Sequence, residues 1–483
     1  MSGIDYYPQM ISHVITTKKD TLQVYSPYDA KCIAKVETAN AAVVEQALQN
    51  AHKLFSDRTS WLSVVQRIEV FKRVLVLMKN QFECLAKQAS AEGGKPLLDS
   101  RIEMSRCIDS MRLCMESLRT QHAEPPTMGI NTASQHRAVI MKKEPIGVVV
   151  SVSAFNHPLN LIAHQVGPAI AAGCPVIVKP SGDTPLSCLS LVRLFHEAGL
   201  AKEWCQWIMP ETKELSESLV TDERVGFFSF IGSARVGWSL RSKLAKGTRC
   251  SLEHGGVAPV IMAEDADLDL AIPQLLKGAF YHAGQVCVSV QRLFVHESIV
   301  DDVVSQLTDG AKKLVVGDPL SEQTEVGPLI RASELQRVES WVQEAVDAGA
   351  ILKCGGHRIS HQCYAPTVLY HPPIDAKVSK SEIFGPVVCI YPFKHVDDAI
   401  AQANALDVAF QASVYSQNLD RGFYISERLN ASAVMLNDHT AFRVDWMPFA
   451  GLGQAGLGVG GIPHTMHDMQ IDKMTVIFSR ELS

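Results

Sequence analysis

The sequence predicts an α/β protein with two doubly wound parallel sheets and a small additional β arm. From Pro145 onwards, short apolar runs rich in β-branched residues alternate with stretches of helical periodicity. The alternation occurs in two separate series, and near-continuous apolar strands are typical of parallel sheets covered by helices on both faces. With 483 residues, of which 47% are hydrophobic and 20% charged, the chain can bury the large cores that such domains require.

The individual elements are predicted from the spacing of apolar residues. Steps of three and four residues in the N-terminal part indicate amphipathic helices over residues 40–55 and 64–89. The first series has strands at 147–155, 175–179, 207–209 and 226–231, with helices such as 184–197 and 234–246 between them. The second series has strands at 259–262, 292–296 and 387–392, and helices at 299–313, 332–348 and 396–406.

Two segments fit neither sheet. Residues 124–143 contain Pro125-Pro126 and Gly129 before an alternating run, which predicts a projecting hairpin, and residues 474–480 predict a terminal strand. Exposed edges of this kind are normally paired or covered. We therefore expect a first α/β domain of residues 1–123 and 144–252, a second of residues 253–437, and an arm of residues 124–143 with 465–483.

Composition excludes several classes of partner. The net charge of −6 gives no reason to expect a nucleic acid or an acidic membrane surface. Neither a secretory signal nor a membrane-spanning apolar run is recognisable. The twelve cysteines are scattered without a CxxC pair, which indicates buried thiols and a cytoplasmic location rather than a disulfide framework.

A thiol and a carboxylate lie in two short glycine-containing segments. Glu253 belongs to Leu252-Glu253-His254-Gly255-Gly256 and Cys287 to Gly284-Gln285-Val286-Cys287. A cysteine can attack a carbonyl carbon, and a nearby glutamate can then activate the water that releases the product. Because Glu253 falls near the junction of the two domains and Cys287 in the second, a cleft between the domains is the expected site.

Four further segments extend this pattern to most of the chain: Phe155-Asn156-His157-Pro158, Lys179-Pro180-Ser181, Phe230-Ile231-Gly232-Ser233 and Glu382-Ile383-Phe384-Gly385-Pro386. In order and spacing the six segments resemble the NAD(P)-dependent aldehyde dehydrogenase superfamily. The resemblance implies a Rossmann-like cofactor domain followed by a catalytic domain. It also implies that the arm and the C-terminal strand join subunits into a homodimer or homotetramer.

The resemblance implies roles for three catalytic residues. Cys287 is the nucleophile that forms a thiohemiacetal with an aldehyde, and the Asn156 amide with the Cys287 backbone N–H stabilises the oxyanion. Glu253 is the general base that hydrolyses the resulting thioester. Relatives that transfer the acyl group to coenzyme A lack this glutamate, so its presence favours release of a free carboxylic acid.

The resemblance also implies how NAD(P)+ is held. Ser233, with Gly232, meets the pyrophosphate at a helix N-terminus, where N–H groups favour an anion. The other implied cofactor residues are Gly237, Lys179 with Ser181, Glu382 and Phe384. Gly182 stands where the family often has a glutamate that repels a 2′-phosphate, so NADP is expected to be accepted. The alternative is that another group replaces that contact and NAD is still used.

Positions that line the substrate tunnel in the resembled family are polar in this chain. They are His157, His164 and Arg443, while Phe449 keeps an aromatic ring. An arginine fork suits a carboxylate or phosphate, so we expect a short, anionic aldehyde such as a semialdehyde or a hydroxylated or phosphorylated aldehyde. Gln165 and Gly460 replace a lysine and a glutamate proposed to relay protons in the family, which leaves water activation to Glu253.

Some features are set aside and two other functions stay open. Residues 451–456 match GxGxxG but follow no strand and open no helix, so they are not expected to bind phosphate. The scattered histidines have no partners at metal-ligand spacing, and no metal is expected. A cofactor-independent esterase that uses Cys287, Asn156 and Glu253 is one alternative, and an inactive nucleotide-binding or structural homologue is the other.

Overall fold

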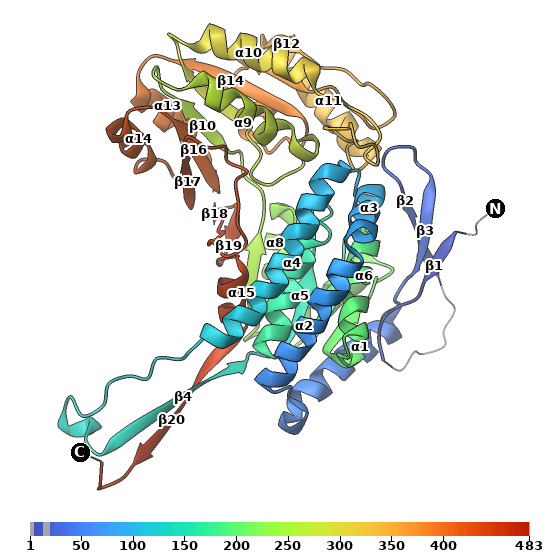
Figure 1. Ribbon diagram of the computed structural model, residues 1–483, viewed down its shortest axis with the longest axis vertical. Helices are drawn as coiled ribbons and strands as arrows, with labels where there is room; N and C mark the ends of the chain where they lie inside the picture. The colour runs from blue at the N-terminus through green and yellow to red at the C-terminus, as the bar shows by residue number, and fades with distance from the viewer. Residues whose placement is uncertain (1–3, 13–19, 483) are drawn as a thin grey trace.

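The structure is a computed structural model that describes residues 4–12 and 20–482. Figure 1 shows two α/β bodies, one above the other, and a long two-stranded arm that projects from the lower body. The predicted α/β class with two wound sheets is confirmed. Residues 1–3, 13–19 and 483, which fall within the expected first domain and the C-terminal segment, lie outside the described residues.

The lower body is built on a six-stranded sheet in the order β19-β9-β8-β5-β6-β7. Five of these strands are parallel, and β19 pairs antiparallel with β9 at one edge. The strands are β5 (Val148–Val152), β6 (Val176–Lys179), β7 (Cys205–Trp207), β8 (Val225–Ile231), β9 (Arg249–Glu253) and β19 (Gly456–Leu457). The strand expected at 207–209 is misplaced, because Trp207 is the last residue of β7 that pairs with β6.

Helices cover both faces of this sheet, because successive strand residues enter two different cores. Val149 packs in one core and Val148 with Val150 in the other. The first core also contains residues of α2 (Val64–Asn80), α3 (Phe82–Gly93), α4 (Leu97–Thr120), α5 (Asn160–Ala172), α6 (Pro185–Glu197) and α15 (Ile462–Asp468). The second contains residues of α1 (Ala41–Ser56), α7 (Lys213–Thr221) and α8 (Ala234–Arg241).

The upper body is built on a seven-stranded sheet in the order β12-β13-β14-β11-β10-β16-β17. All its pairs are parallel except β12 with β13. The strands are β10 (Pro259–Met262), β11 (Arg292–His296), β12 (Ile351–Cys354), β13 (Thr367–Tyr370), β14 (Val387–Phe393), β16 (Gln411–Tyr415) and β17 (Ala433–Leu436). The helices are α9 (Leu268–Phe280), α10 (Val300–Lys313), α11 (Ala332–Asp347), α12 (Lys377–Lys380), α13 (Val396–Ala403) and α14 (Leu419–Ser426).

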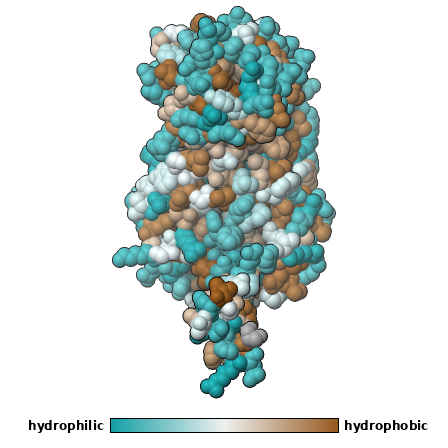
Figure 2. Space-filling model, turned by 90° about the vertical axis from the view of Figure 1, so that its left-hand side faces the viewer, coloured by the Kyte–Doolittle hydropathy of each residue, from teal (hydrophilic) through white to brown (hydrophobic). Residues whose placement is uncertain are grey.

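The arm consists of β4 (Arg137–Pro145) and β20 (Gln470–Phe478), which pair antiparallel along their whole length. The hairpin expected within residues 124–143 is wrong, because β4 finds its partner in the C-terminal segment instead of in its own. Figure 2 shows the arm as a narrow extension below the body, with hydrophobic residues on its surface. Met474, Val476, Ile477 and Phe478 are between 41% and 61% exposed.

Smaller elements complete the fold. A three-stranded sheet combines β1 (Asp5–Tyr7), β2 (Thr21–Tyr25) and β3 (Cys32–Glu37). Short 3₁₀ turns lie at 58–60, 132–134, 202–204 and 281–284, and β15 (Val408–Ala409) pairs with β18 (Leu452–Gly453). The GxGxxG segment therefore contributes to two short strands, and the next helix, α15, begins only at Ile462.

Two properties concern the chain as a whole. Within residues 4–12 and 20–482, no helix combines the length and the apolar character needed to cross a membrane. All twelve cysteines are free thiols.

Candidate active site

The carboxyl ends of β5, β6, β8 and β9 open into a cavity of about 1330 Å³. From β5 to β7 the chain adds strands on one side of β5, and from β8 onwards it adds them on the other side. Ligands bind at such a switch point in open parallel sheets. Fourteen of the fifteen predicted site residues line this cavity: Asn156, His157, His164, Lys179, Ser181, Gly182, Gly232, Ser233, Glu253, Cys287, Glu382, Phe384, Arg443 and Phe449. The exception, Gly237, lies beneath it, where an added Cβ would overlap the ring of His254.

The segment that carries Cys287 follows α9 through a tight left-handed turn. His282, Ala283 and Gly284 have φ of 48°, 54° and 69°. A side chain at Gly284 would overlap the carbonyl of Gly385, so the turn requires glycine there. The backbone N–H of Gly256 donates to the carbonyl of Cys287 at 3.2 Å. That bond ties the thiol segment to the glycine turn that follows Glu253.

Asn156 lies directly against the same segment. Its side-chain Nδ2 donates to the carbonyl of Gln285 at 3.0 Å, and the residue is 5% exposed. The start of α5 behind it is fixed by Glu103, whose Oε1 accepts the backbone N–H groups of Leu159 and Asn160 at 2.8 and 2.9 Å. Glu103 is in turn paired with the buried Lys95 at 2.5 Å. The loop that presents Asn156 is therefore anchored to α4.

The Cys287 thiol is protonated at neutral pH. Burial raises its pKa to about 12, the charge of Glu382 adds to the rise, Arg443 opposes it and Glu253 adds to it again. Burial also raises the pKa of Glu253, and Arg443 again opposes the shift. Arg443 is therefore the cation that favours the ionised forms of both nucleophile and base.

Gln165 and Gly460, the two positions at which no proton-relay group is expected, make hydrogen bonds to backbone groups. The Gln165 amide donates to the carbonyls of Val152 and Ser229 at 3.2 and 3.1 Å, so it joins the ends of β5 and β8. Gly460 pairs with Phe449 through two backbone hydrogen bonds. Neither position supplies a group that titrates.

The cofactor half of the cavity has polar groups without strong partners. Oε1 of Glu382 is buried and makes no hydrogen bond within the described residues, and burial raises the pKa of this carboxyl to about 8. Among the described residues, Lys179 Nζ has one hydrogen-bond acceptor, the carbonyl of Pro180 at 3.0 Å. Ser233 begins α8 without capping it through its hydroxyl. These groups fit a dinucleotide, which offers hydroxyls to a carboxylate and a pyrophosphate to helix N–H groups.

Two further cofactor positions are shaped by the backbone. Phe384 adopts a left-handed conformation with φ of 48° and packs edge-on against Phe155, with ring centroids 5.7 Å apart. Gly182 has open space in front of it, because an added Cβ would touch only Leu22, at 3.5 Å. The structure therefore leaves room beside Lys179 that a carboxylate side chain would fill.

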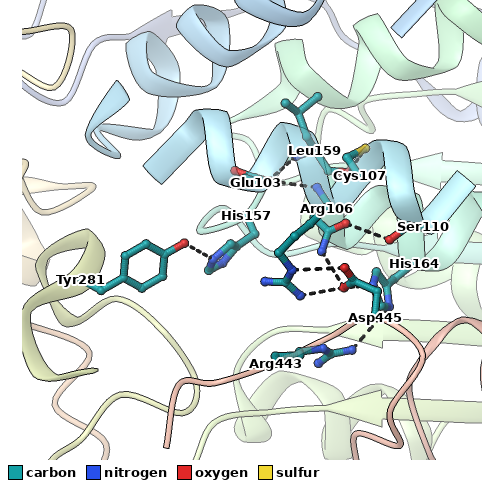
Figure 3. A network of polar contacts seen from close by, with 11 residues as sticks. Glu103, Arg106, Cys107, Ser110, His157, Leu159, His164, Tyr281, Arg443 and Asp445 are labelled. Atoms are coloured by element: carbon teal, nitrogen blue, oxygen red, sulfur yellow. Dashed lines mark hydrogen bonds and ion pairs between the residues drawn. The ribbon is translucent and has the colours of Figure 1, made fainter. Parts of the chain in front are cut away.

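The substrate half of the cavity is polar on one side. Arg443 stacks its guanidinium over Phe449, with Cζ 3.4 Å from the ring centroid. His157 Nε2 lies 3.0 Å from the hydroxyl of Tyr281. His164 lies between Asp445, at 2.7 Å, and Arg443, at 3.4 Å, so both of its ring nitrogens are already engaged (Figure 3).

Sequence reasoning missed several residues that shape this site. Tyr281 lies three residues before the segment that carries Cys287, so its proximity in sequence could have suggested it. No local sequence pattern points to Glu103, Arg106 or Asp445. Arg106 lies on α4 and lines the cavity, and its partner Asp445 is 339 residues away in sequence. Only the folded chain brings them together.

Comparisons with known proteins agree with this geometry. A family model described as the aldehyde dehydrogenase family matches residues 14–475. A 3-sulfolactaldehyde dehydrogenase from Priestia aryabhattai is 34% identical over 477 residues, covering 99% of each chain. A lactaldehyde dehydrogenase from Methanocaldococcus jannaschii is 32% identical over 466 residues, covering 96% of this chain and 98% of that one.

Solved structures give the same result. Aldehyde dehydrogenase 21 from Physcomitrella patens, in complex with the reaction product succinate, superposes with a TM-score of 0.94 at 34% identity and 99% coverage of each chain. A glyceraldehyde-3-phosphate dehydrogenase from Methanocaldococcus jannaschii, complexed with NADP, has a TM-score of 0.90 at 31% identity, covering 96% of this chain and all of that one.

Proposed function

Because the chain belongs to the aldehyde dehydrogenase family, and so oxidises aldehydes with NAD(P)+, we propose that its substrates are short anionic aldehydes and that it acts through a thioester on Cys287. The observation that carries the proposal is the composition of one cavity. Cys287, Asn156 and Glu253 line it together with Arg443. A nucleophile, an oxyanion donor, a base and an anion-binding group thus face the same space.

The first step is attack by sulfur. The Cys287 thiol first gives up its proton to solvent water, and the resulting thiolate forms a bond to the carbonyl carbon while the π electrons of the carbonyl move onto oxygen. The side-chain amide of Asn156 and the backbone N–H of Cys287 donate to that oxyanion. Arg443 also promotes this step, since its charge lowers the pKa of the Cys287 thiol.

The residues assigned to NAD(P)+ would hold it at the start of α8 and beside Glu382. Gly232 and Ser233 would receive the pyrophosphate, Lys179 with Ser181 the adenosine ribose, and Glu382 with Phe384 the nicotinamide ribose. Gly237 allows close packing beneath them. When bound, NAD(P)+ supplies the acceptor for the hydride that leaves the thiohemiacetal carbon.

The second step is hydrolysis of the thioester. Glu253 takes a proton from a water molecule, whose oxygen attacks the acyl carbon while the bond between that carbon and sulfur breaks. The product is a carboxylic acid, and the thiol is restored. Burial holds the pKa of Glu253 above its ordinary value, which suits a base that works near neutral pH.

The anionic substrate class follows from Arg443. Arg443 is half-buried and lines the cavity with its charged side chain. A carboxylate or sulfonate of a substrate in the cavity would pair with this charge. The relative named above for sulfolactaldehyde, and the succinate in the moss enzyme, are in keeping with such a substrate.

A panel of aldehydes tests the proposal. The expected result is NAD(P)H formation that is faster, by kcat/KM, with succinic semialdehyde than with butanal, which has the same chain length and no charge. Cys287→Ala should abolish it, while Cys84→Ala, at an exposed cysteine outside the cavity, should not. Oxidation that persists without Cys287, or a preference for butanal, would contradict the assignment.

We further propose that the chain divides into the two α/β domains expected from the sequence, with β19 and α15 added to the first, and that the arm joins subunits in a homodimer or homotetramer. Support comes from the row of exposed apolar side chains on β20, since a long uncovered apolar strand is an aggregation hazard in a monomer. Light scattering should give a mass of two or four chains. Phe478→Asp should lower that mass.

We also propose a cytoplasmic location. The twelve free cysteines suit a reducing compartment. Fractionation of the native host, with the enzyme followed by antibody, tests this.

A further inference from the structure

Asp445 lies behind the wall of the substrate half of the cavity. It is 2% exposed and does not line the cavity itself. Its Oδ1 accepts from Arg106 Nη2 at 2.7 Å, from His164 Nε2 at 2.7 Å and from Asn160 Nδ2 at 3.1 Å. Its Oδ2 accepts from Arg106 Nε at 3.2 Å. Figure 3 shows Arg106 and His164 directed towards this one carboxylate.

This carboxylate is ionised at neutral pH. Burial alone would raise its pKa, but the hydrogen bond from His164 and the charge of Arg106 hold the pKa well below its ordinary value. A carboxylate with this many donors is a stable acceptor. Asp445 therefore contributes a full negative charge.

His164 contributes no charge. Burial lowers its pKa to about 4, although the hydrogen bond to Asp445 opposes the shift. The neutral ring places its proton on Nε2, because that atom faces the Asp445 oxygen, and leaves the Nδ1 lone pair to accept from Arg443 Nη2. The imidazole thus connects Asp445 to Arg443 and offers no free donor to a substrate.

The two arginines on this wall are not equivalent. Arg106 lines the cavity, and its Nη1 makes no hydrogen bond within the described residues, but its charge is balanced by the bidentate pair with Asp445. Within the described residues Arg443 forms no ion pair, and the carboxylate that most raises the pKa of its guanidinium is the catalytic base, Glu253. Together Arg106, Asp445, His164 and Arg443 leave one net positive charge opposite the substrate.

We propose that Asp445 determines how much negative charge a substrate can carry into the substrate half of the cavity. The enzyme therefore takes aldehydes with a single negative charge, such as carboxylates and sulfonates, and discriminates against dianionic phosphates and phosphonates. Asp445 is a positioning residue in this scheme, because it acts on the substrate through Arg106. The inference rests on the proposed oxidation of anionic aldehydes and narrows its substrate class. A second negative charge would enter a low-dielectric site without a second free cation, which is unfavourable.

A matched pair of substrates isolates charge from shape. In 3-oxopropanesulfonate and 3-oxopropylphosphonate the distal group is tetrahedral with three oxygens, but the sulfonate carries one charge and the phosphonate carries two above its second pKa. At such a pH the wild-type enzyme should favour the sulfonate by at least about tenfold in kcat/KM. Butanal serves as the neutral reference for both.

Asp445→Asn tests the role of the carboxylate. The variant keeps an acceptor oxygen and nearly the same volume, but it frees the charge of Arg106. The ratio of sulfonate to phosphonate turnover should shift towards the phosphonate by about tenfold or more. Asp109→Asn is the matched control: Asp109 lies on α4 one turn from Arg106, pairs with Arg112 at 3.2 Å and does not line the cavity, so the ratio should not move.

Each outcome decides a different point. A wild-type enzyme that oxidises the phosphonate as well as the sulfonate overturns the charge limit while the anionic-aldehyde function stands, and this comparison does not depend on any variant folding. A uniform loss with all three aldehydes in Asp445→Asn gives Asp445 a merely structural role and overturns the inference. No oxidation of any aldehyde, or a preference for butanal over both anions, overturns the proposed function and the inference together.

Discussion

The carboxylate of Glu253 occupies the space in which a side chain at Gly460 would begin. A Cβ built on Gly460 overlaps Oε1 of Glu253 and lies 3.0 Å from its carboxyl carbon. A side chain at position 460 therefore cannot accompany Glu253 in its present position. With Gln165 held by backbone carbonyls at the other relay position, the base has no titratable neighbour at either site.

Gly460→Ala should slow deacylation. The methyl group displaces the Glu253 carboxylate from the water it activates, so we expect steady-state turnover to fall at least about tenfold, within the range that general-base catalysis contributes. The first turnover should be spared, because Cys287 and Asn156 are untouched. Stopped-flow measurement of NAD(P)H should then show a burst of about one equivalent per active site.

Gly317→Ala is the control for this experiment. A Cβ there would lie 3.6 Å from Thr324, which is ordinary contact, and Gly317 is outside the cavity. Equal steady-state rates in Gly460→Ala and the wild-type enzyme would show that Glu253 tolerates the displacement, and a lost burst would place the damage before the thioester.

The Cys287 thiol should react slowly with alkylating agents in the free enzyme, and its rate should keep rising with pH. Because its pKa is raised to about 12, the thiolate fraction grows about tenfold per pH unit throughout the range from neutral to pH of about 10. An ordinary thiol levels off above its pKa of about 8.5. Iodoacetamide labelling followed by mass spectrometry of the Cys287 peptide measures this.

The same labelling tests the influence of Arg443. Since its charge lowers the pKa of the thiol, Arg443→Met should slow labelling of Cys287 at each pH. The exposed Cys84, which does not line the cavity, reports reagent activity in the same sample. A plateau for Cys287 near pH of about 8.5 would contradict the influence of burial.

Gly182→Glu should turn cofactor preference towards NAD+. Among the described residues an added Cβ at Gly182 meets only Leu22, at 3.5 Å, and a carboxylate extending from this cavity wall would bond ribose hydroxyls and repel a 2′-phosphate. We expect the ratio of kcat/KM for NADP+ to that for NAD+ to fall at least about tenfold. Gly182→Gln has nearly the same size without the charge, and an equal fall in that variant would assign the effect to volume.

Much of the fold could be predicted because its strands are apolar throughout. The strands expected at 259–262 and 292–296 coincide with β10 and β11, since buried parallel strands leave a continuous apolar run in the sequence. The helix α4 was missed for the opposite reason: its buried face carries Asp99, Ser100 and Glu103, which blur the helical periodicity. Those polar groups are buried with partners that no local pattern reveals.

The partner of β4 could not be predicted either. Alternating apolar residues indicate a strand that needs a neighbour, but they do not say which neighbour, and Gln470 pairs with Pro145 across more than half the chain. The same holds for the candidate site. Its motifs locate the thiol, the amide and the base, whereas the pairing of Arg106 with Asp445 depends on how α4 and the segment before α15 pack.

Glu103→Gln should destabilise the protein strongly. Glu103 and Lys95 are an ion pair with 0% and 1% of their side chains exposed, so the variant leaves a buried ammonium without its counter-charge. Removal of one partner of such a pair costs about 3–5 kcal/mol. Urea denaturation should show that loss in the free energy of unfolding, and the double variant Lys95→Met with Glu103→Gln should recover part of it, since the ammonium of Lys95 is then removed as well. If the double variant is as unstable as the single one, the larger share of the loss comes from the two backbone N–H groups of α5 that Glu103 accepts, because both variants weaken that cap equally.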